Sequence, residues 1–216
     1  MLQNGTVISG TMIEKPHTLY TACNITTQII AQVASCQYGG QSFSLTHLAP
    51  FVDMSRQKYR KEVYQELIEA GTHPEEMIVN SIAEQRLKKE IKQAMQLIQY
   101  QIITLMTTNG QAPFVTVFMY INEAPEGLLR DDLVLLIEEM LKQRYQGVKN
   151  SQGVYITPAF PKIIYVLQEN NITEDSTYWR ITQLAAKCTA KRMVPDYISE
   201  KIMKQLKGGD VYVAMG

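Results

Sequence analysis

The sequence predicts an α/β protein built on a parallel sheet. Two short, almost wholly apolar segments read "APFVTVFMYI" and "FPKIIYVLQ", and they have the composition of strands covered on both faces. Each is followed by a segment whose apolar residues recur at helical spacing, and the sequence ends on a third strand-like segment, "VYVAMG". This alternation of strand and helix is typical of parallel sheets and barrels, because parallel neighbours need a crossover connection.

Composition and charge exclude several classes of protein. The chain has 216 residues, 45% of them apolar, which is enough to bury a large core. With 21 basic and 21 acidic side chains it lacks the positive excess of a general nucleic-acid or membrane-surface binder. It has no apolar run near the roughly 20 residues that cross a bilayer, and no signal-peptide pattern at its start. Three widely spaced cysteines favour reduced thiols and a cytoplasmic location, and without CxxC or HExxH no metal site is expected.

The first half is expected to be mainly helical. Residues 1–16 are turn-rich and predict an irregular entry or a hairpin, and a helix follows over 17–36. The pair Gly39-Gly40 ends that helix, and Pro50 is expected to prevent an early restart. The next helix is therefore predicted over 55–70. The apolar positions that predict the first helix are Ala22, Ile25, Ile29 and Val33.

The clearest helix pattern covers residues 73–107. Thr72 is a candidate N-cap, Pro74 suits the first turn, and Glu75 and Glu76 favour the positive end of the helix dipole. About 34 residues at 1.5 Å each would span roughly 50 Å, a length that suits a framework helix or a dimer seam. Its apolar stripe consists of Leu87, Ile91, Met95, Ile98, Ile102 and Leu105.

The second half carries the strands, at 112–121, 160–168 and 211–216, with helices predicted over 126–148 and 175–193. Before the second strand, Pro158 and Pro161 flank Ala159-Phe160 and force an extended path. Either proline could be cis, but at a general frequency of about 5% the trans form is favoured.

Two polar segments are candidate ligand sites. In "SCQYGGQSFSLTH" the glycines allow close backbone approach, and the uncharged groups of Gln37, Gln41 and Ser42 suit a ribose, a base edge or a phosphate. In "TTNGQAPF" the polar pair is Asn109 and Gln111, between a helix and a strand. On residue chemistry alone the ordinary interpretation of each, a helix end followed by a turn, is preferred.

The cysteines offer no catalytic arrangement. Cys23 and Cys188 lie within helical patterns and are expected to be buried and inert, whereas Cys36 at a helix end is expected to be more exposed. Three scattered histidines pair with no nucleophile. Residue chemistry alone therefore predicts an α/β protein that binds something polar.

Long segments of the chain resemble the anaerobic, class III ribonucleoside-triphosphate reductases, which are glycyl radical enzymes. The resemblance covers essentially the whole chain and rests on the following segments, in this order: "TACNITTQIIAQVASCQYGGQSFSLTHLAPFVDMSR", "TLMTTNGQAPFVTVFMY", "GVYITPAFPKIIYVL" and "LAAKCTAKRMVPDYISEKIMKQLKGGDVYVAMG". It implies roughly half of a ten-stranded α/β barrel with long helices. Residues 1–110 would form a mainly helical dimer and effector region, and residues 111–216 would supply the half-barrel strands.

The resemblance also implies a reaction. The family reduces ribonucleoside triphosphates to deoxyribonucleotides: a glycyl radical makes a thiyl radical on a cysteine, and a second cysteine with formate supplies reducing power. The full-length enzyme would use a glycyl radical, zinc and formate, a radical-SAM activating enzyme and a homodimeric assembly. The barrel would hold the sugar against the reactive sulfur and exclude water.

The family's catalytic thiols have no counterpart in this sequence. Family members continue past the final Met-Gly with Cys-Arg-Ser, and their second cysteine precedes the segment "MLQNG". The ATP-cone, the zinc cysteines and the radical glycine are not matched either. The expectation is therefore an internal segment with no catalytic residue, cofactor site or metal ligand of its own, inactive alone.

Binding residues are carried over from the family at matching positions. Glu14 and Gln28 correspond to positions that line the deoxynucleotide effector site, and Lys58 or Lys61 could meet the effector phosphates. The alternative for these four is an ordinary surface role. The candidate substrate-binding residues are Gln37, Gly39, Gly40, Gln41, Ser42, Asn109 and Gln111.

Two other functions remain open at this point. One is a non-catalytic module that binds deoxynucleotide effectors and dimerises, suggested by the long helix. The other is a different glycyl radical enzyme, such as a relative of pyruvate formate-lyase.

Overall fold

A four-stranded parallel sheet organises the fold, in the order β3-β4-β7-β8. The computed structural model describes residues 2–8, 10–36, 39–105, 110 and 113–209. The strands are β3 (Gln41–Ser44), β4 (Val115–Met119), β7 (Lys162–Leu167) and β8 (Asp196–Ser199). The fold class predicted from the sequence, α/β with a parallel sheet, is confirmed.

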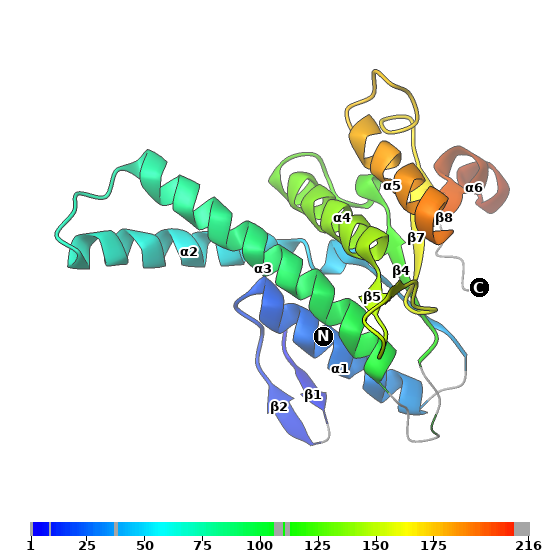
Figure 1. Cartoon of the computed structure of the whole chain (residues 1–216), viewed down its shortest axis with the longest axis horizontal. Coiled ribbons are helices and arrows are strands. Elements are labelled where there is room, and N and C mark those ends of the chain that lie inside the picture. The colour runs from blue at the N-terminus through cyan, green and yellow to red at the C-terminus, as the bar shows by residue number, and fades with distance from the viewer. Residues whose placement is uncertain (1, 9, 37–38, 106–109, 111–112, 210–216) are drawn as a thin grey trace.

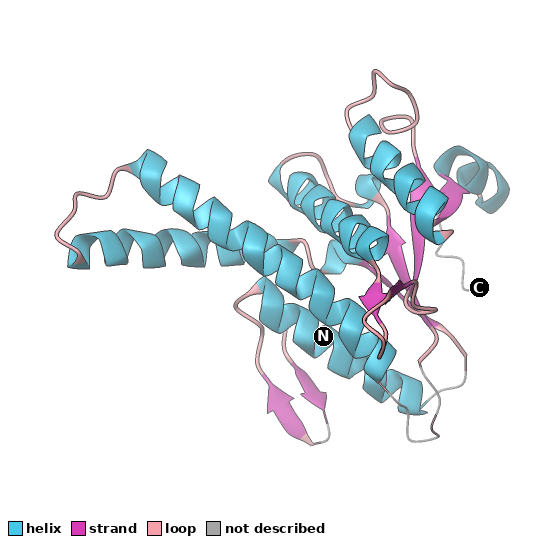
Figure 2. Cartoon of the chain, in the orientation of Figure 1, coloured by secondary structure: helices cyan, strands magenta, loops and turns pink. Residues whose placement is uncertain are grey.

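Helices connect the parallel strands and, with the sheet, form two layers (Figure 2). α1 (Leu19–Cys36) precedes the sheet; α2 (Pro50–Glu69) and α3 (Glu76–Thr104) link β3 to β4. α4 (Leu128–Gln146) links β4 to β7, and α5 (Trp179–Arg192) links β7 to β8. The short helix α6 (Glu200–Lys207) follows β8 directly. The joined ends of α2 and α3 project away from the sheet as a helical hairpin (Figure 1).

Two small hairpins and two 3₁₀ turns complete the described structure. β1 (Thr6–Ile8) and β2 (Thr11–Ile13) pair antiparallel, so of the two alternatives for the start, an irregular entry or a hairpin, the structure has the hairpin. β5 (Val148–Lys149) and β6 (Tyr155–Ile156) form a second hairpin before β7. The turns η1 (Leu45–His47) and η2 (Ile121–Glu123) follow β3 and β4.

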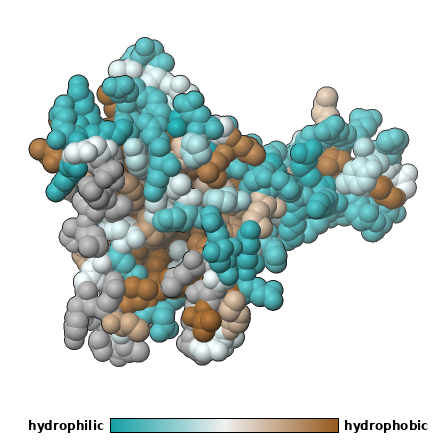
Figure 3. Space-filling model, turned by 180° about the vertical axis from the view of Figure 1, so that it is seen from behind, coloured by the Kyte–Doolittle hydropathy of each residue, from teal (hydrophilic) through white to brown (hydrophobic). Residues whose placement is uncertain are grey.

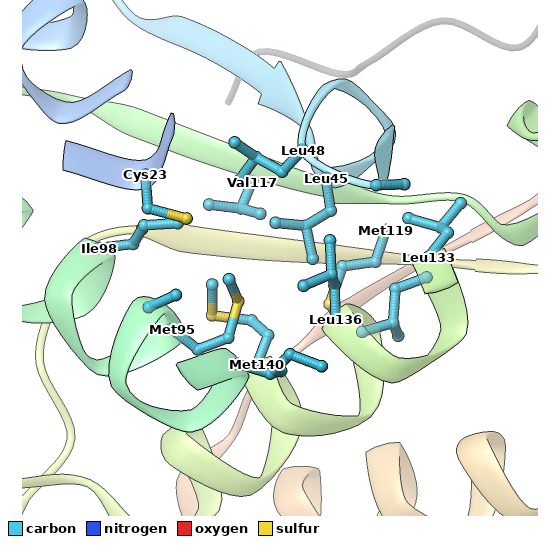
Figure 4. Close-up of a cluster of buried hydrophobic side chains, with 14 of the residues drawn as sticks. Cys23, Leu45, Leu48, Met95, Ile98, Val117, Met119, Leu133, Leu136 and Met140 are labelled. Atoms are coloured by element: carbon cyan, nitrogen blue, oxygen red, sulfur yellow. The ribbon is translucent and has the colours of Figure 1, made fainter. Parts of the chain in front are cut away.

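The main core lies between the helices and one face of the sheet. Figure 4 shows Met95 and Met140 of the helices facing Val117 of β4, with Leu45 and Leu48 from the segment after β3. The apolar stripe predicted on the long helix is confirmed from Leu87 to Ile102, where each member is at most 4% exposed. Burying a side chain of this size stabilises the fold by about 1.5–3 kcal/mol.

The opposite face of the sheet carries a second cluster whose buried members are all strand residues. Phe118, Ile164 and Val166 are buried there, with Tyr120 and Ile198 packed against them. Because side chains alternate along a strand, these residues point away from the helices that cover Val117 and Met119. We call this the strand-only face.

Several predicted boundaries differ from the structure. Pro50 is expected to delay the second helix, but it is the first residue of α2. A backbone N–H at that position has no acceptor within the helix, so the missing N–H of proline costs nothing there. The long helix begins at Glu76 rather than at 73, because the backbone of its N-cap residue Glu75 is extended, with φ −72° and ψ 130°. The Phe160–Pro161 bond is cis, where trans is favoured from the sequence.

Short strands account for the other differences. Residues 41–44 form β3, where the sequence predicts a polar turn. After the last predicted helix, where the sequence predicts no element, the structure has β8 and α6. The last predicted helix begins at Trp179 instead of 175, because Ser176 donates its hydroxyl to the carbonyl of Thr173 in a turn. The strand predicted at 211–216 lies outside the described residues.

Candidate functional site

Polar side chains collect where the parallel strands end. Open parallel sheets bind ligands at the carboxyl ends of their strands, so this edge is the natural place for a site. The register places Ser44, Phe118, Ile164 and Asp196 in one row across the four strands. β3 and β4 end at or just beyond this row, whereas β7 and β8 continue to Leu167 and Ser199, which pair with each other. The carboxyl edge is therefore stepped, and it borders the strand-only face.

The first group joins the ends of β3 and β4. The hydroxyl of Ser44 donates to Oε2 of Glu123, and the hydroxyl of Thr46 donates to the same oxygen over 2.7 Å. The backbone N–H of Thr46 in turn donates to Oγ of Ser44 at 3.2 Å. One carboxylate oxygen thus receives two hydroxyl donors, an arrangement that orients the carboxylate at the strand ends.

The second group joins β4 to the start of α6. Oε1 of Glu200 accepts from the hydroxyl of Tyr120 at 2.6 Å and from Nδ2 of Asn122 at 3.4 Å, and Nζ of Lys204 lies 3.1 Å away. Burial alone would raise the pKa of Glu200, but the bonds from Tyr120, Lys204 and Asn122 outweigh it and lower that pKa. Burial, followed by the bond to Glu200, raises the pKa of Tyr120, which therefore stays protonated as the donor.

Amide side chains brace the same edge from β7. Oε1 of Gln168 accepts the backbone N–H of Asn122 at 2.8 Å, and Nδ2 of Asn170 donates to Oδ1 of Asn122 at 2.7 Å. Asn171 is fully buried and donates to the hydroxyl of Tyr165 at 3.0 Å. A pocket of about 550 Å³ opens here, lined by Leu167, Gln168, Glu169, Ile172, Ser199, Glu200, Lys201, Lys204 and Gln205.

Two of the predicted substrate residues, Gln41 and Ser42, lie in β3. Gln41 and Ser42 line a pocket of about 420 Å³ together with His47 and residues of α1. The amide of Gln41 donates to the carbonyl of Ile30 at 2.7 Å, so its donor is already used within the fold. Oγ of Ser42 is buried and has no hydrogen-bond partner among the described atoms, which leaves it available to a ligand.

The two glycines before β3 are explained by backbone conformation and by close packing. Gly39 has a φ of +100°, which favours glycine. A Cβ on Gly40 would lie 2.8 Å from Cδ1 of Phe114, so the close approach at Gly40 is to that ring. Gln37, Asn109 and Gln111 lie outside the described residues.

The predicted effector residues lie at separate places, three of them on helices and one before α1. Glu14 is exposed after β2, and Gln28 lines a pocket between α1 and α3 with Gln32 and Gln101. Lys61 lines a different pocket in the α2–α3 hairpin, and Lys58 pairs with Glu62 at 3.6 Å. Within one chain the described structure therefore does not bring Gln28 and Lys61 into a common pocket.

The cysteines match their predicted environments. Cys23 and Cys188 are buried, and burial raises the pKa of Cys188 to about 11 and that of Cys23 further still. Cys36 is exposed. Over the ranges that the structure describes, no group of three His, Cys, Asp or Glu side chains is placed to hold a metal ion. Nor does any described helix have the length and apolar character needed to span a bilayer.

The sequence gives a weak signal for the strand-edge residues. Tyr120, Glu123 and Glu200 each come directly after, or within a few residues of, a short strand. "MYINE" could have indicated an edge site, because polar residues there follow an apolar strand. Glu200 could not be found in this way, because β8 has only four residues and two of them are polar.

Comparisons with known proteins agree with one another. A family model described as anaerobic ribonucleoside-triphosphate reductase matches residues 1–216. The anaerobic ribonucleoside-triphosphate reductase of Enterobacteria phage T4 is 35% identical over 216 residues, which cover 99% of this chain and 33% of the relative. The enzyme of that name from Escherichia coli K12 is 34% identical over 202 residues, covering 92% of this chain and 26% of the relative. The chain thus spans about a third or less of these relatives.

Solved structures support the fold. The anaerobic ribonucleotide reductase of Thermotoga maritima in complex with dATP and CTP aligns with a TM-score of 0.56 at 14% identity, covering 92% of this chain and 31% of that one. The same reductase with dATP bound in the specificity site aligns at 0.58 and 13% identity, with 94% and 32% covered. Since the family model matches the whole chain, it favours the reductase over a pyruvate formate-lyase relative. The chain belongs to the anaerobic ribonucleoside-triphosphate reductase family.

Proposed function

We propose that the chain is a segment of an anaerobic reductase that converts ribonucleoside triphosphates to deoxyribonucleotides by glycyl and thiyl radical chemistry. Membership of the family carries the proposal, and the parallel sheet supports it. The complete enzyme would be cytoplasmic and homodimeric, would use formate as reductant and would depend on a radical-SAM activating enzyme. The strand-only face would line one half of a ten-stranded barrel.

The described residues fit a chamber wall better than a radical centre. The buried thiols of Cys23 and Cys188 have raised pKa values, so neither is a ready nucleophile or metal ligand. They do not fit the catalytic cysteines or the zinc site, which we assign to other parts of the enzyme. Formate, the glycyl radical and zinc therefore enter no step that these residues perform.

The chain's own contribution would be to exclude water and to orient a sugar. Phe118, Ile164 and Val166 give the strand-only face an apolar floor, where electrostatic interactions with a ligand are strengthened. The hydroxyls and carboxylates at the strand ends, Ser44 with Glu123 and Tyr120 with Glu200, are polar groups of fixed direction beside that floor. Fixed polar groups beside an apolar surface are the usual composition of a small-ligand site.

Comparing two forms of the protein tests this proposal. The isolated chain, incubated without oxygen with an activating enzyme, formate and CTP, is expected to give no dCTP. The complete reductase containing these residues is expected to give dCTP under the same conditions. Product from the isolated chain would contradict its inactivity, and a complete enzyme that forms its radical but no product would contradict the proposed reaction.

A non-catalytic role in binding deoxynucleotide effectors and in dimerisation is the second candidate. The pockets beside Gln28 and Lys61 favour it, because both lie on the helical part of the chain. Binding to the native state must raise the melting temperature, so titration with dATP, dGTP and dTTP tests it. The Lys58→Ala/Lys61→Ala variant should lose the shift, and no stabilisation at millimolar nucleotide would contradict this role.

A further inference from the structure

The helix α6 is attached to the molecule through a polar contact more than through apolar packing. It has eight residues, and its side chains Ile202 and Leu206 are 49% and 73% exposed. Glu200, its first residue, is the one member of the helix that is buried, at 8% exposure. A helix this short is not stable alone, so its position depends on a few contacts.

The Glu200 contacts reach across the sheet. Its carboxylate accepts from Tyr120, 80 residues earlier in the chain, at 2.6 Å, and from Asn122 at 3.4 Å. Asn122 is fixed to the sheet independently of α6, because its backbone N–H donates to Gln168 and its side-chain oxygen accepts from Asn170. Lys204, one turn along α6, places its ammonium 3.1 Å from the same carboxylate oxygen. The fixed side of the contact is therefore the β4–β7 edge, and the dependent side is α6.

α6 also forms one wall of the 550 Å³ pocket described above. Lys201, Lys204 and Gln205 line it from the helix, and Leu167, Gln168 and Ile172 line it from the end of β7. If α6 left the sheet, the pocket would lose one side and become an open surface. The contact that holds α6 therefore also determines whether this pocket exists.

We propose that Glu200 is a positioning residue, a carboxylate latch that holds α6 against the carboxyl edge of the sheet and closes the pocket between β7 and α6. The bond from Tyr120 is the main support of the latch, because it is short, crosses to another element and is partly buried. This inference goes beyond the proposed reaction and does not depend on it.

Hydrogen exchange of the chain, read by mass spectrometry, tests the latch. In the Glu200→Ala variant, amides 202–207 should exchange at least tenfold faster, whereas peptides from β4 and β7 should keep their wild-type rates. Tyr120→Phe removes one donor and should accelerate the same amides by a smaller factor. The matched control is Glu169→Gln, which changes an exposed carboxylate lining the same pocket and should leave α6 unchanged.

The double variant separates a latch from general loosening. If Tyr120 acts through Glu200, Tyr120→Phe added to Glu200→Ala should cause little further acceleration in α6. Three outcomes would each overturn the proposal. The first is fully additive effects of the two substitutions, the second is wild-type exchange of α6 in Glu200→Ala, and the third is equal acceleration across β4, β7 and α6. None of these readouts involves nucleotide reduction, so the latch can fail without affecting the proposed function.

Discussion

Asp132 and Arg56 form the most buried ion pair among the described residues, and they connect the helices. Arg56 contacts Asp132, reaches Glu84 at 2.8 Å and reaches Asp53 at 3.1 Å, so one guanidinium links α2, α3 and α4. Asp132 is 1% exposed. Burial opposes ionisation of Asp132, whereas the guanidinium of Arg56 favours the ionised carboxylate. The hydrogen bond to Asp132 is also the main cause that raises the pKa of Arg56. Removal of one partner should therefore be costly.

The Asp132→Asn variant should lower the free energy of unfolding by about 3 kcal/mol, because it leaves the buried end of Arg56 without its charge partner. Urea denaturation of the chain measures this loss. The control is Glu84→Gln, whose side chain is 42% exposed and whose loss should stay below about 1 kcal/mol. Equal losses in the two variants would show that burial does not distinguish the two contacts.

Arg144 is buried without a carboxylate partner among the described residues. It is 1% exposed, donates to the carbonyl of Pro158 at 3.0 Å and also donates to the carbonyl of Pro161. Burial lowers the pKa of Arg144 to about 10, so the side chain is still charged at neutral pH. Two carbonyl groups before β7 depend on this one side chain.

Arg144→Lys should lower the free energy of unfolding by about 2 kcal/mol, because a lysine ammonium does not have the planar fork that serves two carbonyl groups. Thermal unfolding of the chain measures it. Arg180→Lys is the matched control, since the Arg180 side chain is 61% exposed, and it should change little. A lysine variant as stable as wild type would show that the fork is not needed.

Polar residues near a strand were recognisable from the sequence, but their partners were not. For the candidate ligand residue Gln41, the sequence does not show that its amide donates to a carbonyl 11 residues earlier. For Gly40, it does not show the close approach to the ring of Phe114. Such contacts arise from tertiary packing, on which residue type and spacing carry no information.

At the scale of elements, long segments were predictable and short ones were not. The helices from Leu19 and Leu128 have apolar residues at helical spacing, and the strands β4 and β7 are short apolar runs, so the sequence predicts all four. β3 and β8 have four residues each and contain polar side chains, because they lie at the edges of the described sheet. Edge strands need fewer apolar residues, so their pattern resembles a loop.

The packing of α4 against α5 should depend on pH. Glu138 pairs with Lys142 at 2.7 Å on its own helix and with Arg180 at 2.6 Å on α5. Burial would raise the pKa of Glu138, but Lys142 and Arg180 outweigh it and lower that pKa. A lowered pKa means that the pair stabilises the fold above the unfolded-state pKa of about 4.3, and that this contribution disappears as pH falls through the folded-state pKa.

Glu138→Gln should therefore be less stable than wild type by about 1 kcal/mol at pH 7, and the difference should disappear as pH falls through the folded-state pKa of Glu138. Urea denaturation over this pH range measures both values. Glu126→Gln removes a carboxylate that is 88% exposed and should differ little from wild type at any pH. A Glu138→Gln deficit that persisted at low pH would point to packing rather than charge.

The whole molecule has two structurally different parts, the sheet with its helices and the projecting α2–α3 hairpin. Seen from behind, the projecting helices are mostly hydrophilic, whereas apolar side chains gather over the body (Figure 3). Near its free end the hairpin is held by Val63 and Val79 and by the pair of Arg86 with Glu66 at 2.7 Å. Exposed residues 71–73 and 75–78 make up most of its tip.

The tip should be the first site of limited proteolysis, because exposed connections with few contacts are cut most readily. A protease specific for glutamate should cut first between Glu69 and Glu76, before it reaches Glu90, which is 5% exposed in the middle of α3. Mass spectrometry of the early fragments identifies the site. First cleavage within α4 or α5 would mean that the body opens before the hairpin.

The position of that turn has a consequence for assembly from parts. The two helices that it joins, α2 and α3, already contact each other, and Val63 and Ala83 are buried on them. A polypeptide ending at Ala70 and a second one starting at Thr72 would keep both of these helices. Co-expressed, they should recombine into the native arrangement without a peptide bond between them, which would make this turn suitable for split-protein complementation.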